Sequence, residues 1–264
     1  MGQILLVEDS KMFGRVVKRA IENAFDLPVY WAKSYAETQG LLTVAKGSFT
    51  MALVDYVLPD AARGEAVDLV TGAGISTFVF TSTIDEELRE QIWAKRVADY
   101  LLKEDPHSLA AIVAAIHQLT VNQQTLVLVV DGSGSLRRRI SELLYVRQYR
   151  VLNAADGGSA LQILDDHPEI ELMITGYHMP GLDGVALCQK VREGRGAARL
   201  AILGMASQRQ PEGGARLLKG GANDFFVKES FLVEEFYCRV SNSLETVRLH
   251  RQIGENGISG SIRR

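Results

Sequence analysis

The chain has 264 residues, of which 47% are hydrophobic and 23% charged, and its formal net charge is −3. This composition excludes a globally disordered or collagen-like chain, and the slightly acidic balance argues against a nucleic-acid binder that works through a broad basic surface. At roughly 100–200 residues per domain, the length predicts about two domains.

The first segment, MGQILLVEDS, is a short apolar run that ends in acid. It has no basic start, so it does not read as a signal peptide. The longest apolar runs, such as Leu126 to Val130, fall far short of the ~20 residues that cross a bilayer. Cys188 and Cys238 form no disulfide framework or zinc cluster, which favours a reducing compartment, and we expect both to be buried in helices. The chain therefore reads as a cytoplasmic protein without a membrane segment.

In the first half of the chain, short apolar runs alternate with longer amphipathic stretches. Their pattern predicts strands at residues 3–8, 28–32, 51–55, 77–81 and 99–102. It predicts helices at residues 11–25, 35–46, 65–72, 85–96 and 107–119. Continuous apolar strands with helices between them indicate a parallel sheet covered on both faces, and five such units suit an α/β, doubly wound, flavodoxin-like (βα)5 domain.

The second half repeats the first at a nearly constant offset. The positions that correspond are Glu8 with Asp131, Asp55 with Gly176, and Lys103 with Lys228. Preserved order and small drift indicate one fold used twice. We therefore expect tandem flavodoxin-like domains at residues 1–120 and 121–250, with a disordered tail or connector over 251–264.

Chemically suited side chains stand at the ends of the expected strands of the first domain. They are Glu8, Asp9, Asp55, Thr81 and Lys103. Parallel strands end on one edge of a sheet, so these groups should meet there. Crowded carboxylates repel one another, and their hard oxygens favour Mg²⁺. With a cation and a hydroxyl donor beside them they suit phosphoryl chemistry, for which Asp55 is the best nucleophile.

Each of these residues taken alone has a plainer interpretation. An aspartate at a strand end is commonly the N-cap of the next helix, and a lysine there is commonly an ordinary surface charge. It is the joint occurrence of five suitable residue types at successive strand ends that favours a functional site.

With these residues in these places, the first half of the chain resembles the receiver domain of bacterial two-component response regulators. The resemblance rests on Leu5-Leu-Val-Glu-Asp-Ser10, Asp55 with Pro59, Thr81-Ser82 and Tyr100-Leu-Leu-Lys103, and it covers nearly all of residues 1–119. It implies that Asp55 accepts phosphate from a phosphohistidine on a histidine kinase or phosphotransfer protein.

The resemblance also implies a Mg²⁺ ion in the first domain only. Asp9 and Asp55 would bind it directly, Glu8 through water, and Val57 through its backbone carbonyl.

Three further roles follow from the same resemblance. Thr81 would close on the phosphoryl group, Lys103 would pair with it, and Tyr100 would be the aromatic switch. The chain departs from the family pattern in a loop one residue longer before Gly64, and in Glu104 where a proline is usual. Neither departure removes a chemical group.

The second domain keeps the frame of the first but lacks part of its chemistry. Asp131, Phe225 and Lys228 retain the acid, aromatic-switch and lysine positions, whereas Gly132, Gly176 and Ala206 replace the second acid, the phosphoacceptor and the Thr or Ser. Glycine cannot carry an acyl phosphate, so we expect a pseudo-receiver that is neither phosphorylated nor strongly metal-bound. The basic run at residues 137–139 falls on an expected helix, where a solvated face is the usual explanation.

The C-terminal segment predicts a long helix to about Ile253, followed by a Gly/Ser-rich stretch. A plain extended helix end and a dimerising coiled coil both fit, so a homodimer through this helix stays open. Tandem receivers resemble the N-terminal half of regulators that carry a GGDEF-type diguanylate cyclase. The chain is then either a fragment or a stand-alone signalling protein.

The pattern as a whole predicts a response regulator in a phosphorelay, in which phosphorylation switches protein interactions and through them an output such as a diguanylate cyclase. We expect no direct nucleic-acid or membrane partner, and no enzymatic activity in this chain beyond self-phosphorylation from phosphodonors and autodephosphorylation. The alternative is a Mg²⁺-dependent phosphatase or phosphotransferase that acts on a small substrate. The first domain shows no cap insertion or specificity loop that would favour it.

Overall fold

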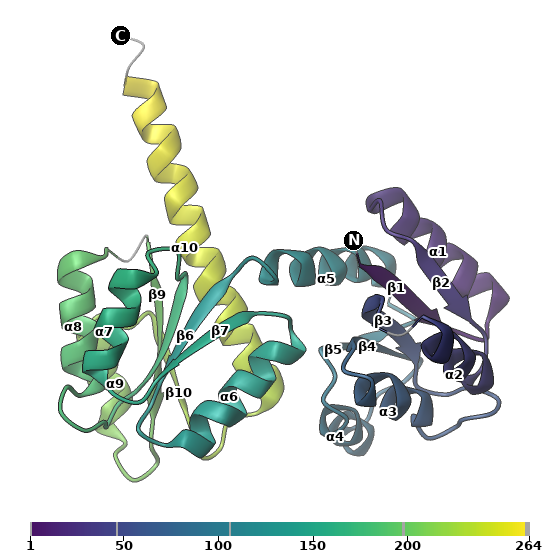
Figure 1. Ribbon diagram of the computed structural model, residues 1–264, viewed down its shortest axis with the longest axis horizontal. Helices are drawn as coiled ribbons and strands as arrows, with labels where there is room; N and C mark the ends of the chain where they lie inside the picture. Colours follow the sequence, from purple (N-terminus) through teal and green to yellow (C-terminus); the bar gives the residue numbers. More distant parts are fainter. Residues whose placement is uncertain (1, 46, 106, 197–198, 262–264) are drawn as a thin grey trace. The chain divides into compact units, whose positions relative to one another are not determined.

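The computed structural model consists of two five-stranded parallel sheets, each flanked by helices on both faces (Figure 1). It describes residues 2–45, 47–105, 107–196 and 199–261, with side chains described as far as residue 253. The elements from β1 to α5 form one compact unit and those from β6 to α10 form another. The predicted fold class, two flavodoxin-like domains in tandem, is confirmed.

The sheet of the first domain runs in the order β2-β1-β3-β4-β5. Its strands are β1 (Gln3–Val7), β2 (Val29–Ala32), β3 (Phe49–Asp55), β4 (Ser76–Thr81) and β5 (Asp99–Leu102). Its helices are α1 (Lys11–Ala24), α2 (Tyr35–Val44), α3 (Glu65–Gly72), α4 (Glu86–Ala94) and α5 (Ser108–Asn122). The predicted ranges agree within about three residues at each end, as expected for boundaries read from sequence.

Alternating side chains of the buried strands form two separate cores. Ile4 and Leu6 pack with α1 and α5, whereas Leu5 and Val7 pack with α3 and α4 on the opposite face. Because neighbouring residues of a strand point to opposite faces, continuous apolar strands are required in a sheet that is covered twice. The polar residue that follows each strand is thereby left at the edge of the sheet.

The second domain repeats this topology in the order β7-β6-β8-β9-β10. Its strands are β6 (Leu126–Val130), β7 (Arg150–Ala154), β8 (Leu172–Gly176), β9 (Ala201–Ala206) and β10 (Asp224–Val227). Its helices are α6 (Gly134–Val146), α7 (Gly157–Asp166), α8 (Gly184–Gly194), α9 (Glu212–Lys219) and α10 (Val233–Ser261). One core joins the sheet to α7, α8 and α9.

The first turns of α10 belong to the core of the second domain. Phe236, Tyr237, Val240 and Leu244 are buried, and the Tyr237 hydroxyl donates to the Leu143 carbonyl of α6 at 3.0 Å. The predicted tail over 251–264 falls largely outside the residues whose side chains are described, so it stays a prediction, as does dimerisation through this helix.

The two cysteines differ in environment. Cys188 of α8 is buried, and burial raises the pKa of its thiol to about 12. Cys238 is exposed, so the expectation that it is buried is wrong. The buried face of α10 is set by Phe236, Val240 and Leu244, and Cys238 falls outside that stripe.

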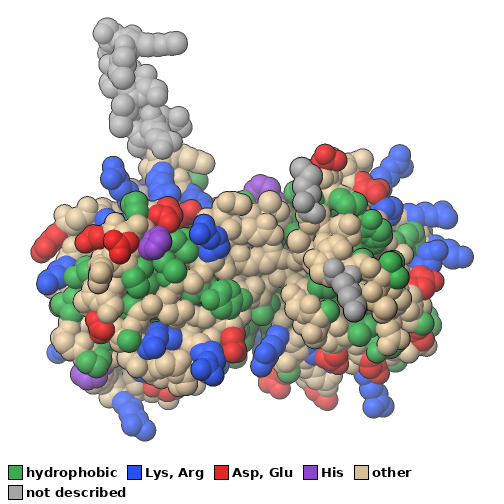
Figure 2. Space-filling model, in the orientation of Figure 1, with side chains coloured by type: hydrophobic (Ala, Val, Ile, Leu, Met, Phe, Trp, Pro, Cys, Tyr) green, Lys and Arg blue, Asp and Glu red, His purple; other side chains and the backbone are tan. Residues whose placement is uncertain are grey.

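Acidic and basic side chains are interspersed over the visible face of each domain (Figure 2). Within the described part of the chain, no helix combines the length and the apolarity that crossing a bilayer requires.

Candidate functional site

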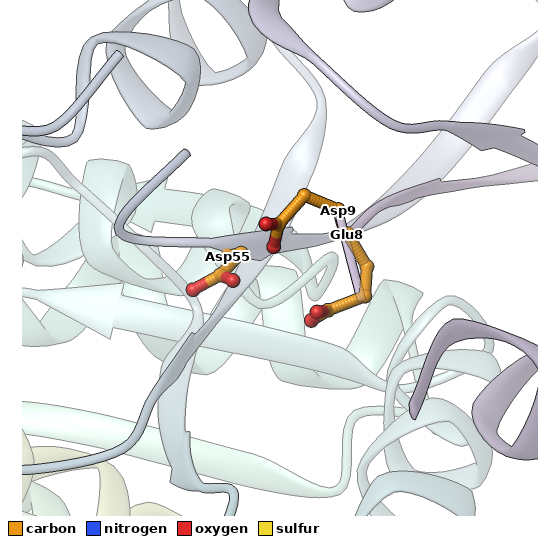
Figure 3. Close-up of side chains that lie close together, drawn as sticks. All are labelled: Glu8, Asp9 and Asp55. Atoms are coloured by element: carbon orange, nitrogen blue, oxygen red, sulfur yellow. The ribbon is translucent and has the colours of Figure 1, made fainter. Parts of the chain in front are cut away.

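Three carboxylates converge at one edge of the first sheet (Figure 3). Glu8 and Asp9 follow β1, and Asp55 ends β3, which pairs in parallel with β1 so that Val7 lies opposite Val54. One oxygen from each carboxylate lies within 4.8 Å of the others. Glu8 and Asp55 are buried and Asp9 is exposed, so the cluster opens to solvent at Asp9. The strand-end pattern predicts this grouping, and the structure shows it.

Lys103, which follows β5, bridges the two buried carboxylates. Its Nζ lies 2.5 Å from Asp55 Oδ2 and 2.8 Å from Glu8 Oε2. The three side chains are 16%, 7% and 0% exposed respectively. The Lys103 N–H also donates to the Thr81 carbonyl at 2.9 Å, which keeps the lysine at the edge of the sheet. The bridge therefore supplies one positive charge to a cluster of three acids.

Burial dominates the electrostatics of this cluster. It raises the pKa of Glu8 and of Asp55, although Lys103 acts in the opposite direction on both, and the negative charge of Asp9 adds to the rise at Asp55. Burial also acts to lower the pKa of Lys103, but its hydrogen bond to Asp55 and its charge interactions with Asp55 and Glu8 outweigh this, and that pKa is raised. Burying these charged carboxylates therefore costs folding free energy, and a further cation would reduce that cost.

The residues fit a hard divalent cation such as Mg²⁺. All the side-chain donors are carboxylate oxygens, which Mg²⁺ prefers, and the cluster is open on one side for water. Glu8 Oε2 is buried and, within the described structure, its ion pair with Lys103 lacks hydrogen-bond geometry. Val57, whose carbonyl is the predicted backbone ligand, is 54% exposed, and its N–H donates to Asp55 Oδ1 at 3.3 Å.

The two predicted switch residues lie on neighbouring strands. Thr81 at the end of β4 is 5% exposed, and its hydroxyl donates to the Thr83 carbonyl at 2.6 Å. Tyr100 of β5 is half-buried and meets Trp93 of α4 edge to face, with ring centroids 5.9 Å apart. The Thr81 hydroxyl is therefore held by backbone beside the cluster.

Tyr56, next to Asp55, is a site residue that the sequence argument missed. Its side chain is buried, and its hydroxyl donates to Gln91 Oε1 of α4 at 3.1 Å. Gly64, at φ +70°, leaves room for the ring, because a β-carbon there would lie 2.7 Å from it. This contact ties the end of β3 to α4.

The internal repeat carried a signal for this tyrosine. Tyr177 follows Gly176 in the second domain as Tyr56 follows Asp55 in the first, and its hydroxyl accepts from Arg216 of α9 at 3.1 Å. Both domains therefore tie the third strand of the fold to its fourth helix.

The equivalent edge of the second sheet is arranged differently. Asp131 is 3% exposed; its Oδ1 accepts from the Ser133 N–H at 2.7 Å, and its Oδ2 accepts no hydrogen bond in the described structure. A β-carbon at Gly176 would collide with that Oδ2. Among the described residues, the Lys228 N–H donates to the Ala206 carbonyl at 3.0 Å, but its ammonium group makes no hydrogen bond or ion pair. Asp131 has taken the space that a side chain at residue 176 would need.

The remaining substituted positions of the second domain are also small. Gly132 is exposed beside Asp131, and Ala206 ends β9 in a buried position. Phe225 packs its ring against Gly214 of α9, where any β-carbon would collide with it. The aromatic position is therefore occupied, whereas residues 132, 176 and 206 themselves carry no carboxylate or hydroxyl.

Comparison with known proteins agrees with the topology. Residues 127–235 match the response regulator receiver domain family. The chain is 35% identical over 102 residues to the two-component response regulator ORR11 of Oryza sativa subsp. indica, covering 39% of this chain and 69% of that protein. It is 35% identical over 102 residues to ORR5 of Oryza sativa subsp. japonica, covering 39% of this chain and 76% of that one.

One solved structure resembles nearly the whole chain. It is a crystal structure described as a two-component system response regulator/GGDEF domain protein, with 36% identity and a TM-score of 0.77. The match covers 94% of this chain and 100% of the other.

Proposed function

The chain belongs to the response regulator family and consists of two receiver domains in tandem, and we propose that the first is the phosphorylated one, with Asp55 as the acceptor. The observation that carries this is the buried Asp55 carboxylate, bridged by Lys103 and grouped with Glu8 and Asp9 within 4.8 Å. A response regulator works with a kinase, so the donor is a phosphohistidine on a histidine kinase or a phosphotransfer protein.

In the transfer step, an Asp55 carboxylate oxygen attacks the phosphorus of the phosphohistidine. The new P–O bond forms as the P–N bond breaks, and its electron pair stays on the imidazole nitrogen, which takes up a proton from solvent. Lys103 remains beside the acceptor and offsets the charge that the phosphoryl oxygens bring. Asp9, Asp55 and the Val57 carbonyl would hold Mg²⁺, and Glu8 would act through water. When bound, the ion neutralises phosphoryl oxygens and carboxylates together.

Phosphorylation then biases a two-state equilibrium. The Thr81 hydroxyl exchanges the Thr83 carbonyl for a phosphoryl oxygen, and Tyr100 changes its position against α4. Tyr56 adds a second connection from the acceptor strand to the same helix through Gln91. The surface that α4 and β5 form is what a partner or an output domain would read.

The second domain serves as a docking or structural partner rather than as an acceptor. Residue 176 has no side chain, and the space beside it is filled by Asp131. The output that we propose is a diguanylate cyclase, supported by the resemblance to a response regulator/GGDEF domain protein. Reading the gene past codon 264 tests this output. A GGDEF segment in frame supports it, whereas an in-frame domain of another kind contradicts it.

The acceptor is tested by incubating the full chain with Mg²⁺ and a small acyl phosphate and measuring its intact mass. We expect a gain of one phosphoryl group that Asp55→Asn abolishes and the matched change in the second domain, Asp131→Asn, retains. Label that survives Asp55→Asn contradicts the assignment. Steady turnover of an unactivated phosphate ester would instead favour the small-substrate phosphatase.

A further inference from the structure

The peptide that joins the two acids of β1 is held by a tryptophan side chain. Trp31 of β2 donates its indole N–H to the Glu8 carbonyl at 2.8 Å. The ladder between the strands ends here, where the Glu8 N–H donates to the Ala32 carbonyl at 3.0 Å and β2 terminates. The indole therefore satisfies a carbonyl that lies just beyond the last backbone pair.

A glycine inside α1 makes room for this indole. A β-carbon at Gly14 would collide with the Trp31 ring, and Gly14 itself is buried. Glycine within a helix costs roughly 1 kcal/mol relative to alanine. The contact with Trp31 gives a physical reason for a residue that helix propensity disfavours.

The second domain satisfies the same carbonyl with the large and small residues exchanged. Arg137 of α6 donates to the Asp131 carbonyl at 2.5 Å. Arg137 lies four residues after Ser133, as Gly14 lies four after Ser10, and Asn153 pairs opposite Val129 in the register that Trp31 has opposite Leu6. The first domain thus supplies the donor from a large strand residue that packs over a helix glycine. The second domain supplies it from a long helix residue, and asparagine stands at the corresponding strand position.

Both domains supply a hydrogen-bond donor to the carbonyl of the residue after the first strand, but from different residues. This indicates that the turn after that strand requires the donor. We propose that Trp31 is a positioning residue for the metal site of the first domain. The peptide unit is planar, so holding the Glu8 carbonyl fixes the plane from which the Asp9 backbone departs, and with it the direction of the Asp9 carboxylate relative to Asp55. This inference rests on the proposed Mg²⁺ site and adds the group that orients it.

The test uses the full chain with Trp31→Phe, which keeps a ring against Gly14 and removes the N–H donor. By analogy with groups that orient metal ligands, we expect the Mg²⁺ dissociation constant, measured by calorimetry, to rise about tenfold. The rate of phosphoryl uptake at saturating Mg²⁺ should stay within about twofold of wild type. Tyr30→Phe, which removes a hydroxyl from the neighbouring residue of β2, is the matched control and should leave both values unchanged.

A second variant separates positioning from stability. Gly14→Ala improves helix propensity but displaces the indole, so it should also weaken Mg²⁺ binding. If both variants bind Mg²⁺ as wild type does, Trp31 has no positioning role, even though Asp55 is still phosphorylated. A wild-type chain that binds no Mg²⁺ would overturn this inference and the proposed metal site together. Phosphoryl uptake that fails in wild type while Mg²⁺ still binds would count against the proposed function alone.

Discussion

Replacing Lys103 by methionine should destabilise the first domain and leave the second unchanged. The substitution keeps an unbranched apolar stem and removes the ammonium group that bridges Glu8 and Asp55 at 2.8 and 2.5 Å. The three carboxylates that converge at this edge would then have no positive charge between them. Their mutual repulsion, together with burial, opposes folding.

The expected size of the effect follows from the burial of the pair. Breaking a buried ion pair by removing one partner costs about 3–5 kcal/mol. Uptake of protons by Glu8 and Asp55 limits the loss, because burial already raises the pKa of each, so we expect about 3 kcal/mol above neutral pH. In a domain of this size that lowers the melting temperature by about 10 °C.

Differential scanning calorimetry and urea unfolding without Mg²⁺ measure this loss. The matched control is Lys228→Met, which removes the corresponding lysine of the second domain. The ammonium group of Lys228 makes no hydrogen bond or ion pair among the described residues, so its loss should cost about 0.5 kcal/mol or less. The Lys103→Met deficit should shrink when the pH is lowered, because protonation removes the uncompensated charge, and also when Mg²⁺ replaces the missing cation.

Two results would refute this reasoning. One is a loss in Lys103→Met no larger than that in Lys228→Met. The other is a deficit that grows as the pH falls, which would mean that the carboxylates are not the source of the instability.

Three further predictions concern neighbouring positions. Without Mg²⁺, Asp55→Asn should gain stability relative to wild type as the pH rises above 3.8. The raised pKa of Asp55 means that the folded wild type binds more protons than the unfolded chain, so wild type loses stability through that range. A stability difference in urea unfolding that does not depend on pH would contradict this. Tyr56→Phe should cost about 1 kcal/mol in the same assay and weaken the coupling of phosphorylation to α4, read as a smaller change in hydrogen exchange there. An unchanged stability and an unchanged exchange response would contradict this role. Gly176→Asp should destabilise the second domain by about 2 kcal/mol, because Asp131 occupies the space that the new side chain needs. In the Asp55→Asn background it should take up no phosphoryl group by intact mass; uptake there would show that the second site is intact.

The sequence was sufficient for the architecture and for the acids. Unbroken apolar strands can only be buried on both faces, and that places the polar residues after them on one edge. Glu8, Asp9 and Asp55 meet there for this reason alone, and the repeat extends the argument to Asp131 and Gly176.

Side-chain direction across elements could not be predicted in the same way. Trp31 lies on an outer strand of the sheet, and nothing in its local pattern reveals that its N–H reaches the Glu8 carbonyl. The one available hint was Gly14, which stands inside a helix without a turn to make. Arg137 lies in the run assigned to a solvated face, yet it donates to the Asp131 carbonyl, because an arginine long enough to reach the sheet edge can do both.

The exchange of Trp31 and Gly14 for Asn153 and Arg137 has a consequence for protein engineering. In the first domain the pair is interdependent, because any side chain placed alone at residue 14 would collide with the Trp31 ring. Installing acids at 132 and 176 would not by itself repair the second domain, since Asp131 would remain in the space that a side chain at residue 176 needs. The transplantable module comprises the acids together with the glycine and the tryptophan behind them, and a chimera should move all of them at once.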